Sequence, residues 1–273
     1  MHYVILGLVQ GLTEFLPVSS SGHLVIVQYL LGLQIPGVAF ETFAHFGTLL
    51  AVIFLFRHDI KFIIIDFCKS LKTIYKRKLF LKYINKNPQS KFGWLLLIST
   101  IPGALTGYYF ESTFEKLFGN PAIVSLMLVV TGISLFITDK FLIKGSKGMK
   151  GITFIDAIFI GFAQAFAIIP GISRSGFTIM MALSRNVKRE FAAKYSFILS
   201  VPIIVGATLF KIKDIYNLDI SINLLILSGL AAFLSGYWAM LFFIKMLVKH
   251  QLRIFSYYLW IIGITTFLFY LAN

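Results

Sequence analysis

The sequence contains little charge and almost no cysteine. Only 13% of its 273 residues are charged and 58% are hydrophobic, whereas a soluble domain usually has about a quarter of its residues charged. The single cysteine, Cys68, excludes an intramolecular disulfide and a cysteine-rich metal site. No proline- or serine-rich linker divides the chain, so we expect one domain over residues 1–273. The composition predicts an integral membrane protein.

Acidic residues are also scarce: 11 stand against 25 lysines and arginines, which gives a net charge of +14. Such a charge could indicate a nucleic-acid partner. The basic residues, however, lie in short clusters between long apolar stretches, as in the cytoplasmic loops of membrane proteins. We therefore expect the lipid bilayer as a partner and no nucleic acid. The first residues lack the basic start of a cleavable signal peptide, so we expect the N-terminus to be retained.

Six apolar stretches are long enough to cross a bilayer core, which needs roughly 17 to 25 helical residues. The segment 69–91 is strongly basic and has no acid, so the positive-inside rule predicts a cytoplasmic loop there. The other basic clusters then also fall inside, and both termini fall outside. The six expected spans are residues 40–56, 92–110, 121–138, 195–210, 222–244 and 254–272.

This orientation requires that residues 1–31 and 152–183 each enter and leave the membrane on the same side. Each segment has a proline and a Ser/Gly-rich turn at its centre, where a continuous helix would break. The two segments also resemble each other, since Gln10 precedes Pro17-Val-Ser-Ser-Ser-Gly and Gln164 precedes Pro170-Gly-Ile-Ser-Arg-Ser-Gly. We therefore predict an all-α polytopic membrane protein with about six transmembrane helices and two re-entrant helical hairpins in an inverted-topology repeat.

The first hairpin carries a carboxylate in an apolar environment. Glu14 lies four residues after Gln10, so a helix places both side chains on one face. A carboxylate at this depth is costly unless it is paired, hydrated or bound to a ligand, which makes Glu14 a candidate site residue. The alternative is a structural hydrogen bond from Glu14 to the serine turn.

The turn that follows offers hydroxyl groups and a histidine. Ser19, Ser20 and Ser21 could bring hydroxyls and backbone amides to a phosphate, or could simply cap the next helix. His23 could act as a general base, a nucleophile or a proton shuttle. A histidine of this kind is otherwise a hydrogen-bonded structural residue.

The second hairpin carries Arg174, whose planar guanidinium is well shaped to hold a phosphate by two hydrogen bonds. Ser173, Ser175 and Thr178 surround it with donors at the start of a helix, which also favours an anion. The expected counter-charge within the protein is Glu14, and a purely structural ion pair between the two is the alternative. A further pair, Glu41 and His45, could line the same cavity or face the membrane interface.

Two motifs resemble those of the undecaprenyl-diphosphate phosphatase family, which is also known for bacitracin resistance. They are Gln10-Gly-Leu-Thr-Glu14-Phe-Leu-Pro-Val-Ser-Ser-Ser-Gly-His23 and Pro170-Gly-Ile-Ser-Arg174-Ser-Gly-Phe-Thr178, and the likeness spans nearly the whole chain. The resemblance implies a hydrolase of the bacterial inner (cytoplasmic) membrane. It implies that this enzyme removes the terminal phosphate of undecaprenyl diphosphate, recycles the lipid carrier for cell-wall synthesis, and uses a divalent cation.

The resemblance also assigns roles to residues. The family's acidic pair corresponds to Gln10 and Glu14, its serine and histidine to Ser20 and His23, and its phosphate-binding loop to Ser173, Arg174 and Thr178. Gln10 removes one negative charge from this site. A Mg²⁺ or Ca²⁺ ion near Glu14 and Gln10 would therefore depend on substrate phosphate and water rather than on a dedicated protein site.

The expected mechanism has Arg174 and the amides near Ser173 hold the diphosphate while Glu14 positions the metal or an attacking water. Ser20, His23 or water is the nucleophile, and the residue types leave all three open. The outward-opening first hairpin predicts catalysis on the external side. A polyprenyl-phosphate transporter or flippase would use the same repeats, and a channel would leave the buried charges unexplained. The sequence leaves open whether copies form a homo-oligomer.

Overall fold

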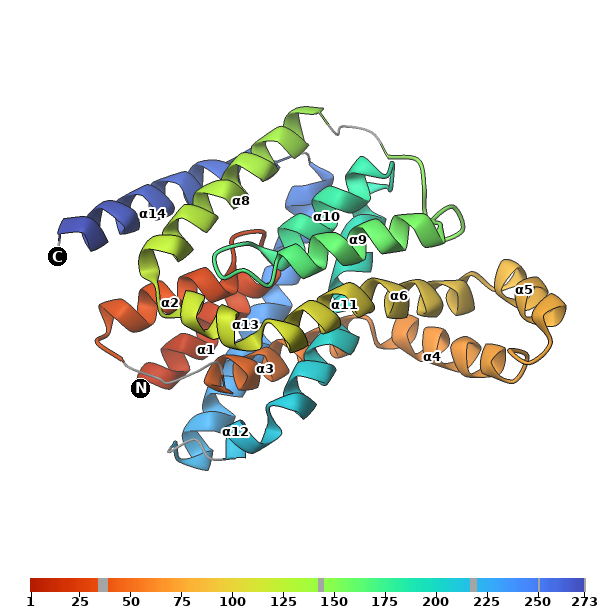
Figure 1. Ribbon diagram of the computed structural model, residues 1–273, viewed down its shortest axis with the longest axis horizontal. Helices are drawn as coiled ribbons and strands as arrows, with labels where there is room; N and C mark the ends of the chain where they lie inside the picture. The colour runs from red at the N-terminus through yellow and green to blue at the C-terminus, as the bar shows by residue number, and fades with distance from the viewer. Residues whose placement is uncertain (34–38, 142–144, 217–219, 250, 273) are drawn as a thin grey trace.

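The computed structural model describes residues 1–33, 39–141, 145–216, 220–249 and 251–272, and these ranges are almost entirely helical (Figure 1). They contain no β-strand, only an isolated bridge between Lys147 and Val187. The helices are α1 (His2–Glu14), α2 (Ser20–Leu30), α3 (Ala39–Leu55), α4 (Arg57–Leu71), α5 (Arg77–Lys86), α6 (Pro88–Tyr109), α7 (Glu111–Phe118), α8 (Pro121–Phe141), α9 (Phe154–Phe166), α10 (Arg174–Ser184), α11 (Arg189–Phe210), α12 (Ile212–Tyr216), α13 (Ile222–Val248) and α14 (Leu252–Ala272).

Four of the described helices, α8, α11, α13 and α14, are long and apolar enough to cross a membrane. They coincide with four of the six predicted spans, so the prediction of a multi-pass helical membrane protein is confirmed. The other two predicted spans fall on α3 and α6. Helix α3 is apolar but only 17 residues long, and α6 has 22 residues but is not among the four.

The basic segment 69–91, predicted as a cytoplasmic loop between two spans, is largely helical, and its side of the membrane stays a prediction. Helix α4 runs to Leu71 and α5 covers Arg77–Lys86, and together they extend away from the rest of the body beside the start of α6 (Figure 1). Lysine, arginine and leucine all favour helix, so a basic segment need not be irregular. Trp94 on α6 binds the end of α4, since its Nε1 donates to Ser70 Oγ at 3.0 Å.

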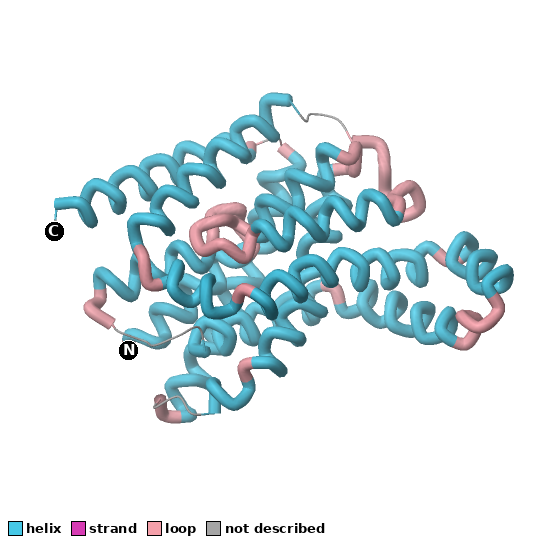
Figure 2. The backbone as a smooth tube through the Cα atoms, in the orientation of Figure 1, coloured by secondary structure: helices cyan, strands magenta, loops and turns pink. Residues whose placement is uncertain are grey.

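The predicted helix breaks are present in both candidate hairpins. Helix α1 ends at Glu14 and α2 begins at Ser20, while α9 ends at Phe166 and α10 begins at Arg174. Both interruptions lie within the helical body rather than at its edge (Figure 2). The two turns meet, because the amide of Gly171 donates to Ser21 Oγ at 3.4 Å and Ser175 Oγ donates to the carbonyl of Leu16 at 3.2 Å.

Each turn is closed by a serine that caps the following helix. The Ser19 side chain accepts from the amide of Gly22 at 3.2 Å, and the Ser173 side chain accepts from the amide of Gly176 at 3.1 Å. Such a cap satisfies an amide that the first helical turn leaves unpaired. In each turn the capping hydroxyl also lies 3.2 Å from the hydroxyl two residues later.

Close helix contacts hold the hairpins in place. Gly11 on α1 faces α13 so tightly that a Cβ atom there would lie 2.0 Å from Ser235 Oγ. Gly161 on α9 approaches α6 in the same manner, and its Cβ would lie 2.9 Å from the carbonyl oxygen of Ser99. Small residues at helix interfaces permit such approach in membranes. Phe15 and Phe197 are both fully buried and pack edge to face next to the turns, with their ring centroids 5.2 Å apart.

Candidate active site

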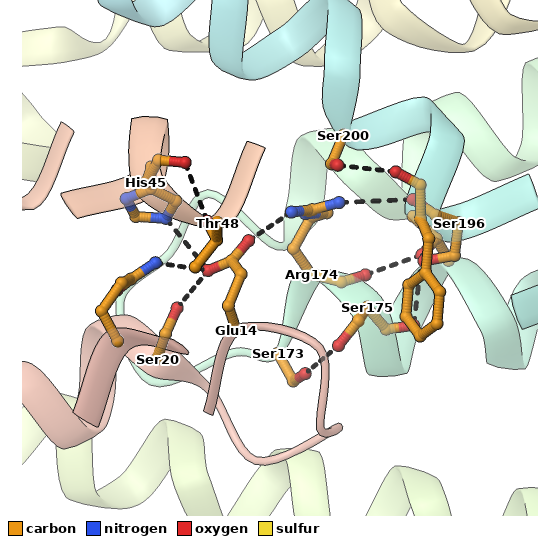
Figure 3. A network of polar contacts seen from close by, with 12 residues as sticks. Glu14, Ser20, His45, Thr48, Ser173, Arg174, Ser175, Ser196 and Ser200 are labelled. Carbon is orange, nitrogen blue, oxygen red and sulfur yellow. Dashed lines mark hydrogen bonds and ion pairs between the residues drawn. The ribbon is translucent and has the colours of Figure 1, made fainter. Parts of the chain in front are cut away.

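Glu14, at the end of α1, is the centre of a buried polar network (Figure 3). Its Oε2 accepts from Gln10 Nε2 at 2.8 Å and from Ser20 Oγ at 2.7 Å, and lies 3.2 Å from His45 Nε2. Its Oε1 is ion-paired with Arg174 Nη2. Both oxygens of this carboxylate are therefore held by side chains from four places in the sequence.

Arg174 is the first residue of α10 and lies with its guanidinium toward Glu14 (Figure 3). Nη2 binds Glu14 and Nη1 donates to the backbone carbonyl of Ser196 on α11 at 3.3 Å. The sequence analysis named Glu14 as the counter-charge, and the structure confirms that pairing. The guanidinium keeps further N–H donors, because it has five in all.

Gln10 contacts Glu14, as the four-residue spacing predicted. Its amide nitrogen faces the carboxylate, and its Oε1 is buried without a hydrogen-bond partner in the described part of the chain. That oxygen does not line the cavity described below. Among the described residues no group of three His, Cys, Asp or Glu side chains could hold a metal ion, and a metal ion near Gln10 and Glu14 stays a prediction.

Of the three serines in the first turn, Ser20 is the one that contacts Glu14. Its hydroxyl donates to Glu14, and it lines the cavity together with Ser19 and Ser21. Ser19 is committed to capping α2, with a backbone φ of 68°, and Ser21 contacts both Ser19 and the amide of Gly171. Ser20 therefore has the one hydroxyl of the turn that contacts a carboxylate.

His23 lies apart from this network. Its Nδ1 is 2.8 Å from the carbonyl of Ser19 and its Nε2 is 2.7 Å from Tyr258 Oη on α14, with the two rings stacked. It is absent from the cavity lining, so the structure does not bring it together with Glu14 and Arg174. Both ring nitrogens have protein partners, which fits the structural alternative for this histidine.

Of the donors predicted around Arg174, some line the cavity and others bond only within the protein. Ser173 lines the cavity, and its amide donates to Thr131 Oγ1 at 3.3 Å. Ser175 bonds to the first turn through the carbonyl of Leu16. Thr178 lies one helical turn behind, where its hydroxyl is 2.7 Å from Ser196 Oγ. Ser175 and Thr178 thus hold the loop, while Ser173 and Arg174 face the open space.

The network opens into a cavity of about 670 Å³. Its inner end is formed by the two turns, by Glu41 and His45 of α3, and by Gln164 of α9. The walls are apolar stretches of α6 and α11. This volume suits a charged head group with part of an apolar chain, because ligand cavities of drug size span about 300 to 1,000 Å³.

Lys211 lies at the other end of the cavity, directly after α11. Its ammonium pairs with Glu111 and, at 3.0 and 3.2 Å, with Glu115 and Asp214, which connects α7 with α12. Burial alone would lower the pKa of Lys211, but the three carboxylates outweigh this and raise the pKa above its usual value. Lys211 therefore stays charged at the mouth of the cavity.

Three polar residues of the cavity were not identified as site residues from the sequence. The pair Glu41 and His45 had been left open between the cavity and the interface, and the structure places both in the cavity with His45 against Glu14. Gln164 was noted only as part of the repeat. It donates to the carbonyl of Ser99 at 3.1 Å and keeps a buried Oε1 without a partner in the described residues. Its match to Gln10 was the available signal.

The chain matches known sequences over nearly its whole length. Residues 3–265 match the family model described as "Bacitracin resistance protein BacA". A protein of Methanobrevibacter smithii is 42% identical over 97% of this chain and 95% of its own length, and one of Thermosipho africanus is 42% identical over 98% and 99%. A third, from Alkaliphilus metalliredigens, is 41% identical over 97% of both. All three are named undecaprenyl-diphosphatase. The chain belongs to the bacitracin resistance protein family.

Proposed function

We propose that this protein hydrolyses undecaprenyl diphosphate to undecaprenyl phosphate and inorganic phosphate. The observation that carries this proposal is the meeting of Glu14, Ser20 and Arg174 in one cavity. A cation for phosphate, a hydroxyl nucleophile and a carboxylate base can together transfer a phosphoryl group through a covalent intermediate. The shared name of the relatives supports the same substrate.

In the first step Ser20 Oγ attacks the terminal phosphorus. The Oγ–P bond forms, the bond from phosphorus to the bridging oxygen breaks, and undecaprenyl phosphate leaves with the electron pair. Glu14 Oε2, 2.7 Å from Ser20 Oγ, takes the hydroxyl proton. Water then attacks the phosphoserine, the P–Oγ bond breaks, and Ser20 regains a proton as phosphate is released. His23, bound to Tyr258, takes no part in these transfers.

Arg174 holds the phosphate throughout. Its guanidinium lies at the start of α10, where the unpaired amides and the helix dipole also favour negative charge. Charge spreads over the transferring phosphoryl group in the transition state, and fixed donors stabilise it there at no cost of reorganisation. Ser173, the residue before Arg174, lines the same cavity.

A divalent cation, Mg²⁺ or Ca²⁺, would be held mainly by diphosphate oxygens and water, with Glu14 nearby. Both oxygens of Glu14 already have protein donors. Diphosphate oxygens and water supply the oxygen ligands that these ions prefer. When bound, the ion neutralises part of the diphosphate charge.

The proposed topology has six transmembrane helices, α3, α6, α8, α11, α13 and α14, and two re-entrant hairpins, α1–α2 and α9–α10, related as an inverted repeat. The matching serine caps and the packing of α1 on α13 and α9 on α6 support the repeat. The basic clusters favour a cytoplasmic location for the start of α9 and the end of α10. In this topology the Lys211 end of the cavity faces outward, which supports a reaction on the external side of the bacterial cytoplasmic membrane.

The decisive experiment is phosphate release in detergent, where no two membrane sides exist. Purified wild type is expected to release inorganic phosphate from undecaprenyl diphosphate in the presence of Mg²⁺ or Ca²⁺. Arg174→Ala, shown to be folded by its melting temperature, is expected to lose at least about a thousandfold in kcat/KM. If folded wild type releases no phosphate under any of these conditions, the hydrolase is refuted and transport of a polyprenyl phosphate becomes the better explanation.

A further inference from the structure

His45 lies beside Glu14 on α3, a helix that contributes to neither of the two serine-capped turns. It comes one helical turn after Glu41, and its Nε2 is 3.2 Å from Glu14 Oε2. Its Nδ1 is 2.7 Å from the backbone carbonyl of Glu41. Arg174 thus contacts one carboxylate oxygen of Glu14, and His45 contacts the other.

Both ring nitrogens of His45 face oxygen atoms that lack a proton. A backbone carbonyl oxygen has no proton to give, so Nδ1 is the donor to Glu41. Glu14 accepts from Ser20 and Gln10 and pairs with Arg174, which is the environment of an ionised carboxylate. A negative charge 3.2 Å from Nε2 favours a second proton on the ring, which makes the imidazole positively charged when that proton is bound.

The ring also reaches the open space. The His45 side chain is 27% exposed, whereas that of Glu14 is 3% exposed, and His45 lines the cavity. A group bound in front of Ser20 would thus meet a cation on each side of Glu14. Figure 3 shows this order, with His45 and Arg174 on opposite sides of the carboxylate.

We propose that His45 is a second cation of the diphosphate site, which holds Glu14 toward Ser20 and contacts the transferring phosphoryl group. The proposal rests on the hydrolase function above. When Glu14 takes the serine proton it becomes neutral, so the charge that both cations had shared is removed at that moment. Arg174 and His45 then both stabilise the negative charge on the phosphoryl oxygens.

The alternative is that His45 serves only as a neutral donor that keeps Glu14 in place. His45→Gln separates the two, because glutamine retains an N–H donor of similar reach but has no charge. His45→Leu removes donor and charge together. His58→Gln is the matched control, since His58 is an exposed histidine on α4 and does not line the cavity.

The experiment measures kcat and KM for undecaprenyl diphosphate and the inhibition constant of inorganic phosphate for wild type and these variants in detergent. For His45→Gln we expect kcat to fall about 10- to 100-fold and phosphate inhibition to weaken about tenfold, because a charge-assisted contact is lost. His45→Leu should lose more of both, and His58→Gln should match wild type. Melting temperatures of all variants are measured alongside.

A His45→Gln variant with wild-type kcat and wild-type phosphate inhibition would overturn the proposal. So would equal losses in His45→Gln and His58→Gln. If His45→Gln cannot be purified in folded form, His45→Asn is assayed with the same criteria. Lack of phosphate release by folded wild type would instead refute the hydrolase itself, and the role of His45 with it.

Discussion

The guanidinium of Arg174 on α10 is ion-paired with the carboxylate of Glu14 on α1, across 160 positions of sequence. Arg174 uses two of its nitrogens at once, one on Glu14 and one on the carbonyl of Ser196. The pair joins the two interrupted segments where their turns meet. The geometry of arginine, and not only its charge, is therefore part of the site.

Arg174→Lys tests that geometry. A lysine keeps the positive charge but offers a single point of contact in place of a planar fork. We expect kcat/KM to fall about 100-fold while the protein stays folded, because the phosphate loses its second hydrogen bond. Steady-state phosphate release measures the effect. Activity equal to wild type would show that charge alone is sufficient.

Ser20 and His23 are separated by their surroundings. Ser20→Ala should lose at least about a thousandfold in kcat, because the nucleophile is removed. His23→Gln should stay within about threefold of wild type in kcat and lower the melting temperature instead, since its bond to Tyr258 is structural. Rapid quenching of wild type with labelled substrate should trap phosphate on Ser20. A His23→Gln variant that is stable but inactive would contradict this assignment.

Gly11→Ala tests the close packing of α1 on α13. The added methyl would lie 2.0 Å from Ser235 Oγ and 2.4 Å from the carbonyl of Ala232, so the helices must separate. We expect a loss of about 1–3 kcal/mol in stability, seen as a lower melting temperature in detergent. Gly229→Ala on α13 is the control, because its nearest neighbour would be Phe43 at an ordinary 3.6 Å. Equal melting temperatures for the two variants would refute the packing.

Lys211→Met tests the ionic cluster at the mouth. Removal of the Lys211 ammonium leaves three unpaired carboxylates, those of Glu111, Glu115 and Asp214, facing the path of an anionic substrate. We expect KM to rise about three- to tenfold at low salt with kcat little changed, and the difference to shrink at high ionic strength. A Michaelis–Menten series at two salt concentrations measures this. A KM change independent of salt would instead indicate a local rearrangement of α7.

We predict that phosphate release depends on a divalent cation that substrate-free protein does not bind tightly. EDTA should abolish phosphate release, and Mg²⁺ or Ca²⁺ should restore it. Titration calorimetry of Ca²⁺ into substrate-free protein should show no saturable binding tighter than about 1 mM, because Glu14 is fully occupied and few ligands remain. Tight binding without substrate would show that the protein holds the ion itself.

The parts of the site that the sequence predicted are those with a local signal. The two breaks follow from proline and Ser/Gly turns, and the partnership of Glu14 with Arg174 follows from the cost of isolated charge in an apolar medium. Four of the spans follow from hydropathy. The breaks and the spans depend on residue type and spacing within a short window, whereas the pairing follows from the scarcity of charge in the apolar segments.

The parts that were missed depend on how distant helices pack. His23 directly follows the serine turn, yet the rotation of α2 carries its ring to Tyr258 on α14. His45 lies outside both motifs, on α3, and only the packing of α3 against α1 brings it to Glu14. Helices α4 and α5 cover much of residues 69–91 because helix propensity acts on basic segments as well as on apolar ones.

The two serine-capped turns share one backbone design but contribute different chemistry. The turn after α1 offers a hydroxyl beside a carboxylate, and the turn before α10 offers a guanidinium. Neither half of the chain therefore contains a complete set of reacting groups. A fragment ending after α8 would keep the acid, the alcohol and His45 but lack Arg174, and one starting at α9 would keep Arg174 alone. Activity is thus a property that arises only when both halves are assembled.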